Sequence, residues 1–220
     1  PTLQVPVWRR EATDPAARVG VLLVNPGGPG FPGWPLVQDE RAFTEELRAH
    51  FDIVALDPRG TFPSTRVDCH IDAEYIGSVD WSPDAPGELE AVNDAIRGFV
   101  DECARDHADV LPHVSTMDTV HDMAILVSSL GEEQVSYLGF SYGTVLGSAF
   151  LATYPELVRA AVLDGAYESF GYGDMFEQEL IAVKALDDFL TRLFDECDAN
   201  PECPIEGGAQ AAFERVSAAA

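Results

Sequence analysis

The residues most suggestive of chemistry form a five-residue segment, Gly139-Phe140-Ser141-Tyr142-Gly143. An apolar run, Val135 to Leu138, comes before it, and a run with helical character, Thr144 to Thr153, follows it. A serine between two glycines at a strand-to-helix turn is typical of a nucleophile elbow, where small flanking residues avoid clashes with neighbouring elements. We therefore interpret Ser141 as a nucleophile. The alternative is a structural glycine turn that carries an incidental serine.

A nucleophilic serine needs a base, and the tetrahedral intermediate that it forms needs hydrogen-bond donors for its oxyanion. The backbone N–H of Tyr142, which directly follows the serine, is the first expected donor. The second is expected from the Gly-Gly-Pro-Gly segment at 27–30, which follows an earlier apolar run. Pro29 has no N–H and can only shape that loop. We prefer Gly28 as the donor, with Gly27 second; a proline-glycine turn without a ligand is the alternative.

The elements that must position these residues are short apolar runs alternating with helical patterns, which is typical of a parallel sheet covered on both faces. We expect four strands, at Val19–Val24, Phe51–Leu56, Val135–Leu138 and Ala160–Leu163. We expect helices at 43–50, 88–106, 117–130 and 144–153, with the second and third packed on the sheet. With the serine turn after the third strand, this order predicts the α/β class and the α/β-hydrolase fold.

Composition limits the partners. The chain has 38 acidic and 13 basic residues, a formal net charge of −25, which repels phosphate backbones and argues against nucleic-acid binding. No run approaches the roughly 18 apolar residues that a membrane span requires, so we expect a soluble protein. The 220 residues are 46% apolar, enough for a core, and we expect one domain with a piece of a second.

The chain has four cysteines and no CxxC unit, which argues against a zinc ribbon. Cys197 and Cys203 flank a short loop and suit a local disulfide, and the even count then leaves Cys69 with Cys103. This interpretation implies an oxidising compartment and therefore a secreted or extracytoplasmic protein. Two alternatives remain: four buried free thiols, and a metal site built from the first two cysteines with His70 and His107. We predict no metal and no cofactor.

Three segments together resemble the tripeptidyl aminopeptidase and prolyl iminopeptidase group of secreted actinobacterial α/β-hydrolases. They are Asn25-Pro26-Gly27-Gly28-Pro29-Gly30, Asp57-Pro58-Arg59-Gly60 and Gly139-Phe140-Ser141-Tyr142-Gly143-Thr144. The resemblance runs from about Val19 to Gly165. It implies an exopeptidase acting on free peptide N-termini, with esterases among its relatives, a helical cap after the fourth strand and, frequently, cysteine pairs. Phe62 and the Phe-Pro-Gly-Trp segment at 31–34 depart from the family pattern and add bulk near the predicted site.

We expect residues 1–171 to form an incomplete hydrolase core and residues 172–220 to begin the cap. Apolar residues at helical spacing between Phe176 and Phe194 indicate a packing face. An aminopeptidase needs a carboxylate for the ammonium group of its substrate. Four acidic residues lie where a cap could supply one, but each is better explained as solvated surface: Glu168, Asp174, Glu177 and Glu179.

The triad of this fold runs serine, acid, histidine along the chain. All five histidines precede Ser141: His50, His70, His107, His113 and His121. Asp164, at the end of the fourth strand, could serve as the acid, but the resemblance points to an acid after a later strand. We therefore expect the catalytic Asp and His, and about two further strands, in a remaining C-terminal segment of the same protein, within the same chain or a cleaved one.

The favoured function is a serine hydrolase, an exopeptidase that releases residues or short peptides through an acyl-enzyme on Ser141. A carboxylesterase or lactone hydrolase would use the same nucleophile, and the Gly-x-Ser-x-Gly pattern does not separate the two. A non-catalytic binding protein of the same fold is the third alternative. The expected partners are a peptide or small ester substrate and the remaining C-terminal segment, without nucleic acid or a membrane span.

Overall fold

The computed structural model describes residues 2–69, 79–81, 83–166 and 175–218, with the backbone alone at 175–179. The chain divides into two compact units, Pro1–Tyr167 and Glu168–Ala220. Our expected boundary between core and cap, at 171 and 172, lies outside the described residues, and the interpretation of the second unit as a cap stays a prediction.

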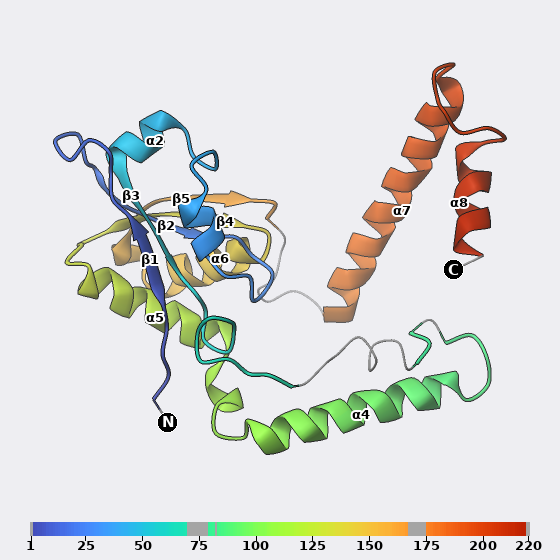
Figure 1. The fold of residues 1–220 in the computed structure, drawn as a ribbon, viewed down its shortest axis with the longest axis horizontal. Helices are drawn as coiled ribbons and strands as arrows, with labels where there is room; N and C mark the ends of the chain where they lie inside the picture. Colours follow the sequence, from blue (N-terminus) through green and yellow to red (C-terminus); the bar gives the residue numbers. More distant parts are fainter. Residues whose placement is uncertain (1, 70–78, 82, 167–174, 219–220) are drawn as a thin grey trace. The chain divides into compact units, whose positions relative to one another are not determined.

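The first unit contains a five-stranded sheet in the order β1-β3-β2-β4-β5 (Figure 1). Its strands are β1 (Val7–Arg10), β2 (Gly20–Asn25), β3 (Phe51–Leu56), β4 (Val135–Phe140) and β5 (Val158–Asp164). The last four strands run parallel to one another, whereas β1 pairs with β3 in the antiparallel sense. The predicted α/β class, the mostly parallel sheet and the four predicted strands are confirmed.

Helices cover both faces of this sheet. On one face lie α5 (Thr116–Ser129) and α6 (Tyr142–Thr153), and on the other α1 (Trp34–Gln38) and α2 (Glu45–His50). Alternate residues of β2 serve the two cores, because successive side chains of a strand point to opposite faces. Val21 and Leu23 pack in the cluster that contains α5 and α6, whereas Leu22 and Val24 pack in the cluster that contains Val37 of α1.

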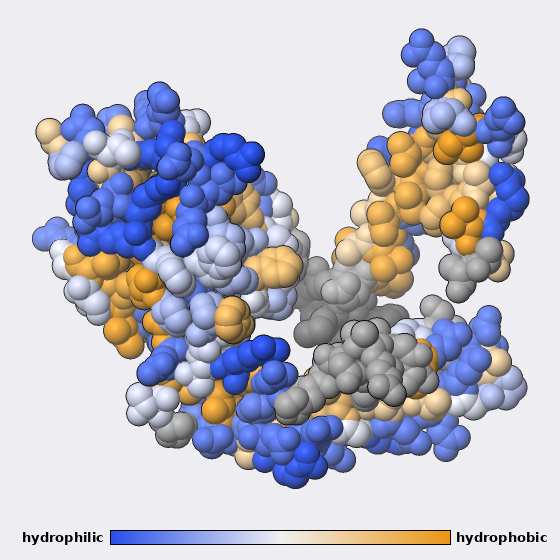
Figure 2. Space-filling view, in the orientation of Figure 1, coloured by the Kyte–Doolittle hydropathy of each residue, from blue (hydrophilic) through white to orange (hydrophobic). Residues whose placement is uncertain are grey.

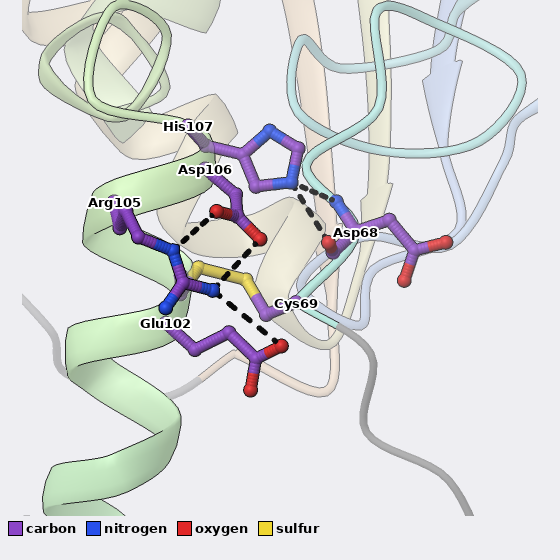
Figure 3. The surroundings of a disulfide bond; sticks show 7 residues. Asp68, Cys69, Glu102, Arg105, Asp106 and His107 are labelled. Atoms are coloured by element: carbon purple, nitrogen blue, oxygen red, sulfur yellow. Dashed lines mark hydrogen bonds and ion pairs between the residues drawn. A yellow bond between two sulfur atoms is a disulfide. The ribbon is translucent and has the colours of Figure 1, made fainter.

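Helix α4 (Glu88–Asp106) forms where the apolar spacing predicts it, but our expectation that it packs on the sheet is wrong. Its apolar residues Leu89, Ile96 and Val100 are exposed. Helical periodicity shows that a helix has an apolar stripe without showing what covers the stripe. The end of α4 is instead fastened to the loop after β3, as Figure 3 shows: Cys103 is joined to Cys69 by a disulfide, and His107 Nε2 lies 2.7 Å from the Asp68 carbonyl oxygen.

The second unit consists of α7 (Met175–Ala199) and α8 (Ala209–Ser217). Their connection is closed by the Cys197–Cys203 disulfide, and the Ala209 N–H donates to Asp198 Oδ1 at 2.8 Å. The Phe194 and Phe213 rings bring the two helices together, with centroids 5.4 Å apart. Figure 2 shows apolar residues gathered on this unit, and several side chains of α7 are exposed: Leu180, Ile181, Val183, Leu186, Phe189 and Leu193. Within the described ranges, no helix is long and apolar enough to cross a membrane.

Candidate active site

Ser141 occupies the turn between β4 and α6 with φ 52° and ψ −121°. It is the only residue other than glycine with a positive φ in the described part of the chain. Such a backbone costs about 1–3 kcal/mol and persists only where its surroundings enforce it. Here the Ser141 N–H donates to the Asp164 carbonyl at 2.9 Å, and the Ser141 carbonyl accepts from the N–H of Thr144 at 2.8 Å. The residue itself is exposed.

The two glycines of the turn are required by close contacts. A Cβ atom at Gly139 would lie 2.2 Å from the carbonyl oxygen of Gly143. A Cβ atom at Gly143 would lie 2.7 Å from the carbonyl oxygen of Asn25, at the end of β2. Below this turn the buried Tyr137 hydroxyl donates to the Gly143 carbonyl at 2.7 Å, and burial raises the pKa of that hydroxyl, so it stays neutral. A strained strand-to-helix turn with small flanking residues is the geometry that a nucleophile elbow requires.

The loop at 27–30 lies directly against this elbow. A Cβ atom at Gly27 would lie 2.5 Å from the Phe140 carbonyl oxygen and 3.1 Å from Ser141 Cβ. The Gly27 N–H donates to Asn25 Oδ1 at 2.9 Å. Because its N–H is engaged in this way, Gly27 is the weaker of the two candidate oxyanion donors. The N–H of Gly28 has no acceptor among the described residues.

Tyr142 is the first residue of α6, so its N–H lies at a helix N-terminus, where the helix dipole favours negative charge. Its N atom would be 3.2 Å from a Cβ atom at Gly27, which places this N–H beside the loop. Across the described residues no acceptor is found for it. The Tyr142 hydroxyl lies 2.8 Å from Oγ1 of Thr116, which is the first residue of α5. This contact holds the Tyr142 side chain against α5. The contact with Thr116 was not expected from the sequence.

The Asp57-Pro58-Arg59-Gly60 segment, one of those that carry the resemblance, braces the elements around the site. Asp57 is fully buried and accepts hydrogen bonds from the Gly33 N–H at 2.6 Å and from Trp8 Nε1. Arg59 binds Asp122 of α5, with Nε 2.7 Å from Oδ2, and this hydrogen bond raises the pKa of the guanidinium. The segment therefore fastens the end of β3 to α1 and α5.

Of the residues that the structure describes, no histidine hydrogen-bonds Ser141. His50 Nδ1 lies 2.7 Å from the Glu46 carbonyl oxygen, and His121 Nδ1 lies 2.8 Å from the Tyr154 hydroxyl. His70 lies outside the described residues, as do Glu168, Asp174 and the side chains of Glu177 and Glu179. Asp164 contributes its backbone carbonyl to the elbow, while the residue as a whole is exposed.

All four cysteines are paired, Cys69 with Cys103 and Cys197 with Cys203. Because the sulfur atoms of Cys69 and Cys103 are joined in a disulfide, the metal site considered from the sequence, which used both cysteines, is not formed. Elsewhere in the described ranges, no group of three or more His, Cys, Asp or Glu residues is placed to hold a metal ion.

The alpha/beta hydrolase fold family matches residues 20–218. Serine protease Hip1 of Mycobacterium tuberculosis is 32% identical over 196 residues, which cover 86% of this chain and 37% of that protein. Tripeptidyl aminopeptidase of Streptomyces lividans is 33% identical over 152 residues, 67% of this chain and 28% of that protein. Carboxylesterase B of M. tuberculosis is 35% identical over 198 residues, which cover 86% of this chain and 37% of that protein. The chain thus spans about a third of the length of these relatives.

Proposed function

The chain belongs to the α/β-hydrolase fold family, and from that premise we propose that it carries the nucleophile of a serine hydrolase, Ser141. The observation that supports this most strongly is the backbone of Ser141, whose positive φ is maintained by contacts from both sides of the turn. The N–H of Tyr142 and that of Gly28 are the donors we assign to the oxyanion hole. Both lack an acceptor in the described part of the chain.

The proposed reaction is acyl transfer in two stages. Ser141 Oγ attacks the carbonyl carbon of the substrate while a base takes its proton, and the carbonyl oxygen becomes an oxyanion that the two N–H groups bind. The carbon–nitrogen or carbon–oxygen bond then breaks, the proton passes to the leaving group, and an ester forms on Ser141. Water hydrolyses this ester by the same steps. Loss of one oxyanion donor typically costs about 2.7–4 kcal/mol of transition-state stabilisation.

The base and the acid that orients it are assigned to a further segment of the same protein. Two observations support this: no described histidine binds Ser141, and the relatives are much longer than this chain. In this proposal that segment is the chain's principal protein partner and adds strands beside β5, the edge strand whose Val162 is 60% exposed. Residues 172–220 begin the cap.

We favour a peptidase that acts on free peptide N-termini. The names of two of the relatives support it, serine protease Hip1 and tripeptidyl aminopeptidase, together with the resemblance of the three sequence segments. A carboxylesterase is the second candidate, because the relative named carboxylesterase B is 35% identical over 198 residues. The two disulfides support an extracytoplasmic location, where such bonds persist.

The test is covalent labelling of the complete protein by a fluorophosphonate, together with hydrolysis of a tripeptidyl anilide and of a p-nitrophenyl ester. Ser141→Ala should abolish labelling and lower hydrolysis by at least about 10⁴-fold. The matched control is Ser148→Ala in α6, where the hydroxyl donates to the Thr144 carbonyl at 2.7 Å and has no proposed catalytic role. Residual activity of more than a few per cent in the Ser141 variant would reject the assignment. The ratio of kcat/KM for anilide and ester decides between peptidase and esterase.

A further inference from the structure

Asn25 is the last residue of β2 and is 3% exposed. It stands in register with Gly139 of β4, so it lies at the point where the loop after β2 meets the elbow after β4. Its carboxamide oxygen accepts the hydrogen bond from the Gly27 N–H at 2.9 Å. The same oxygen would lie 2.9 Å from a Cβ atom at Gly143, so the carboxamide also contacts the first turn of α6. One buried side chain therefore contacts Gly27 and Gly143, each of which is next in the chain to one of the two proposed oxyanion donors.

The contact engages one of the two candidate N–H groups of the loop, that of Gly27. Gly27 has its N–H bound to Asn25 and its carbonyl bound to the Phe31 N–H at 3.3 Å, so both of its backbone groups are engaged. Gly28 follows with an N–H that has no acceptor among the described residues. A buried N–H whose acceptor is removed costs about 1–3 kcal/mol, which favours a backbone rearrangement that finds it a new partner.

We propose that Asn25 is a positioning residue of the oxyanion hole. Its carboxamide holds Gly27 against the elbow and withdraws the Gly27 N–H, so that the Gly28 N–H faces the oxyanion on Ser141. This inference rests on the proposed function. Asn25 acts through Gly27 and Gly28, and its neutral oxygen accepts a hydrogen bond without bringing negative charge to a site where negative charge develops in the transition state.

Two substitutions separate these roles. Asn25→Ala removes the acceptor, and Asn25→Asp keeps it but places a carboxylate beside the oxyanion. Both should lower kcat for a p-nitrophenyl ester by about 10- to 100-fold, as expected for misplaced or opposed transition-state contacts. KM should change by less than about threefold, because ground-state binding does not use the oxyanion. Phenylboronic acid, whose tetrahedral adduct on Ser141 mimics the intermediate, should bind more weakly by the same factor as kcat falls.

The matched control is Asn200→Ala in the second unit. Asn200 Oδ1 accepts from the N–H of Glu202 at 3.0 Å, the same contact between a side chain and the residue two positions on, but on an exposed loop. This variant should keep the kcat of the wild-type protein. All rates are measured on the complete protein and divided by the fraction of Ser141 that a fluorophosphonate labels, so that loss of folded protein does not count as loss of catalysis.

The inference would be overturned if Asn25→Asp had the same kcat per labelled site as the wild-type protein. Because Asn25→Asp keeps the buried hydrogen bond, it provides this test even if Asn25→Ala does not fold. So would a structure of the boronate adduct in which Gly27, rather than Gly28, donates to the oxyanion; we expect the Gly28 N at about 2.7–3.1 Å from it. Failure of the proposed function is a different result, in which the wild-type protein is neither labelled nor active.

Discussion

The backbone of Ser141 makes a prediction about stability that is independent of activity. Replacing Ser141 by alanine removes the hydroxyl and leaves a Cβ atom on a backbone with φ 52° and ψ −121°. Replacing it by glycine removes the Cβ atom as well, and glycine adopts positive φ without steric cost. The two variants therefore differ by the strain at the elbow and by the greater entropy of glycine in the unfolded chain.

The magnitudes of these two effects decide the sign. The strain of a non-glycine residue at such an angle is about 1–3 kcal/mol, and the entropic cost of glycine is about 0.5–1 kcal/mol. Ser141→Gly should therefore be more stable than Ser141→Ala by about 1 kcal/mol, the difference between the centres of these two ranges. At Ser148, within α6, the backbone is helical, and there glycine should be less stable than alanine by about 1 kcal/mol.

Urea unfolding of the four variants measures both differences. The urea midpoints are compared between variants that share the same m value, the slope of the unfolding free energy against urea concentration. With m unchanged, a shift in the midpoint reports a change in stability. The expected result is opposite signs at the two serines, with both Ser141 variants inactive. If alanine is the more stable residue at position 141, as at position 148, the backbone there is not strained and the elbow interpretation loses its main support.

Two further predictions concern the rest of the fold. Burial alone would raise the pKa of Asp52, but hydrogen bonds from Ala12 and from Arg18 and Arg9 outweigh it and hold the pKa below 3.8. The stabilisation is present above the pKa that Asp52 has in the unfolded chain, and it is lost as the pH falls through the lower pKa of the folded protein. Asp52→Asn should therefore lower the free energy of unfolding by about 1–2 kcal/mol at pH 7 and by progressively less below about pH 4. Mass spectrometry of unreduced peptides should find Cys69 joined to Cys103 and Cys197 to Cys203; four alkylatable thiols would contradict both the pairing and the extracytoplasmic location.

The sequence predicts the central strands well because each is an apolar run that ends at residues unfavourable to strands. β3 begins and ends as predicted, and β2 differs by one residue at each end. Strand β1 was missed: Val7–Arg10 is short, and two of its four residues are arginines. Its place depends on a partner far along the chain, since the Arg9 guanidinium binds the buried carboxylate of Asp52. Such long-range pairing leaves little local signal.

The candidate site also contains residues that the local sequence predicts and a contact whose role depends on distant parts of the chain. Ser141 and the glycines around it can be predicted because a strained turn and a close backbone approach leave a pattern of residue types. The contact between Asn25 and Gly27 is local, but its meaning depends on the register of β2 with β4, which places Asn25 opposite Gly139. The asparagine was visible in the sequence as part of the resemblance, without a role.

The strand order supplies an argument for the site that does not use the glycine motifs. From β2 the chain passes to β3 on one side, and it later returns to add β4 on the other side of β2. In open α/β sheets, ligands bind outside the carboxyl ends of the strands at such a reversal, because the two loops leave in opposite directions and open a crevice. The loop after β2 carries Gly27 and Gly28, and the turn after β4 carries Ser141. Asn25, which pairs with β4 and binds the loop, lies where these two segments meet. A substitution there should therefore affect the reaction as well as the fold.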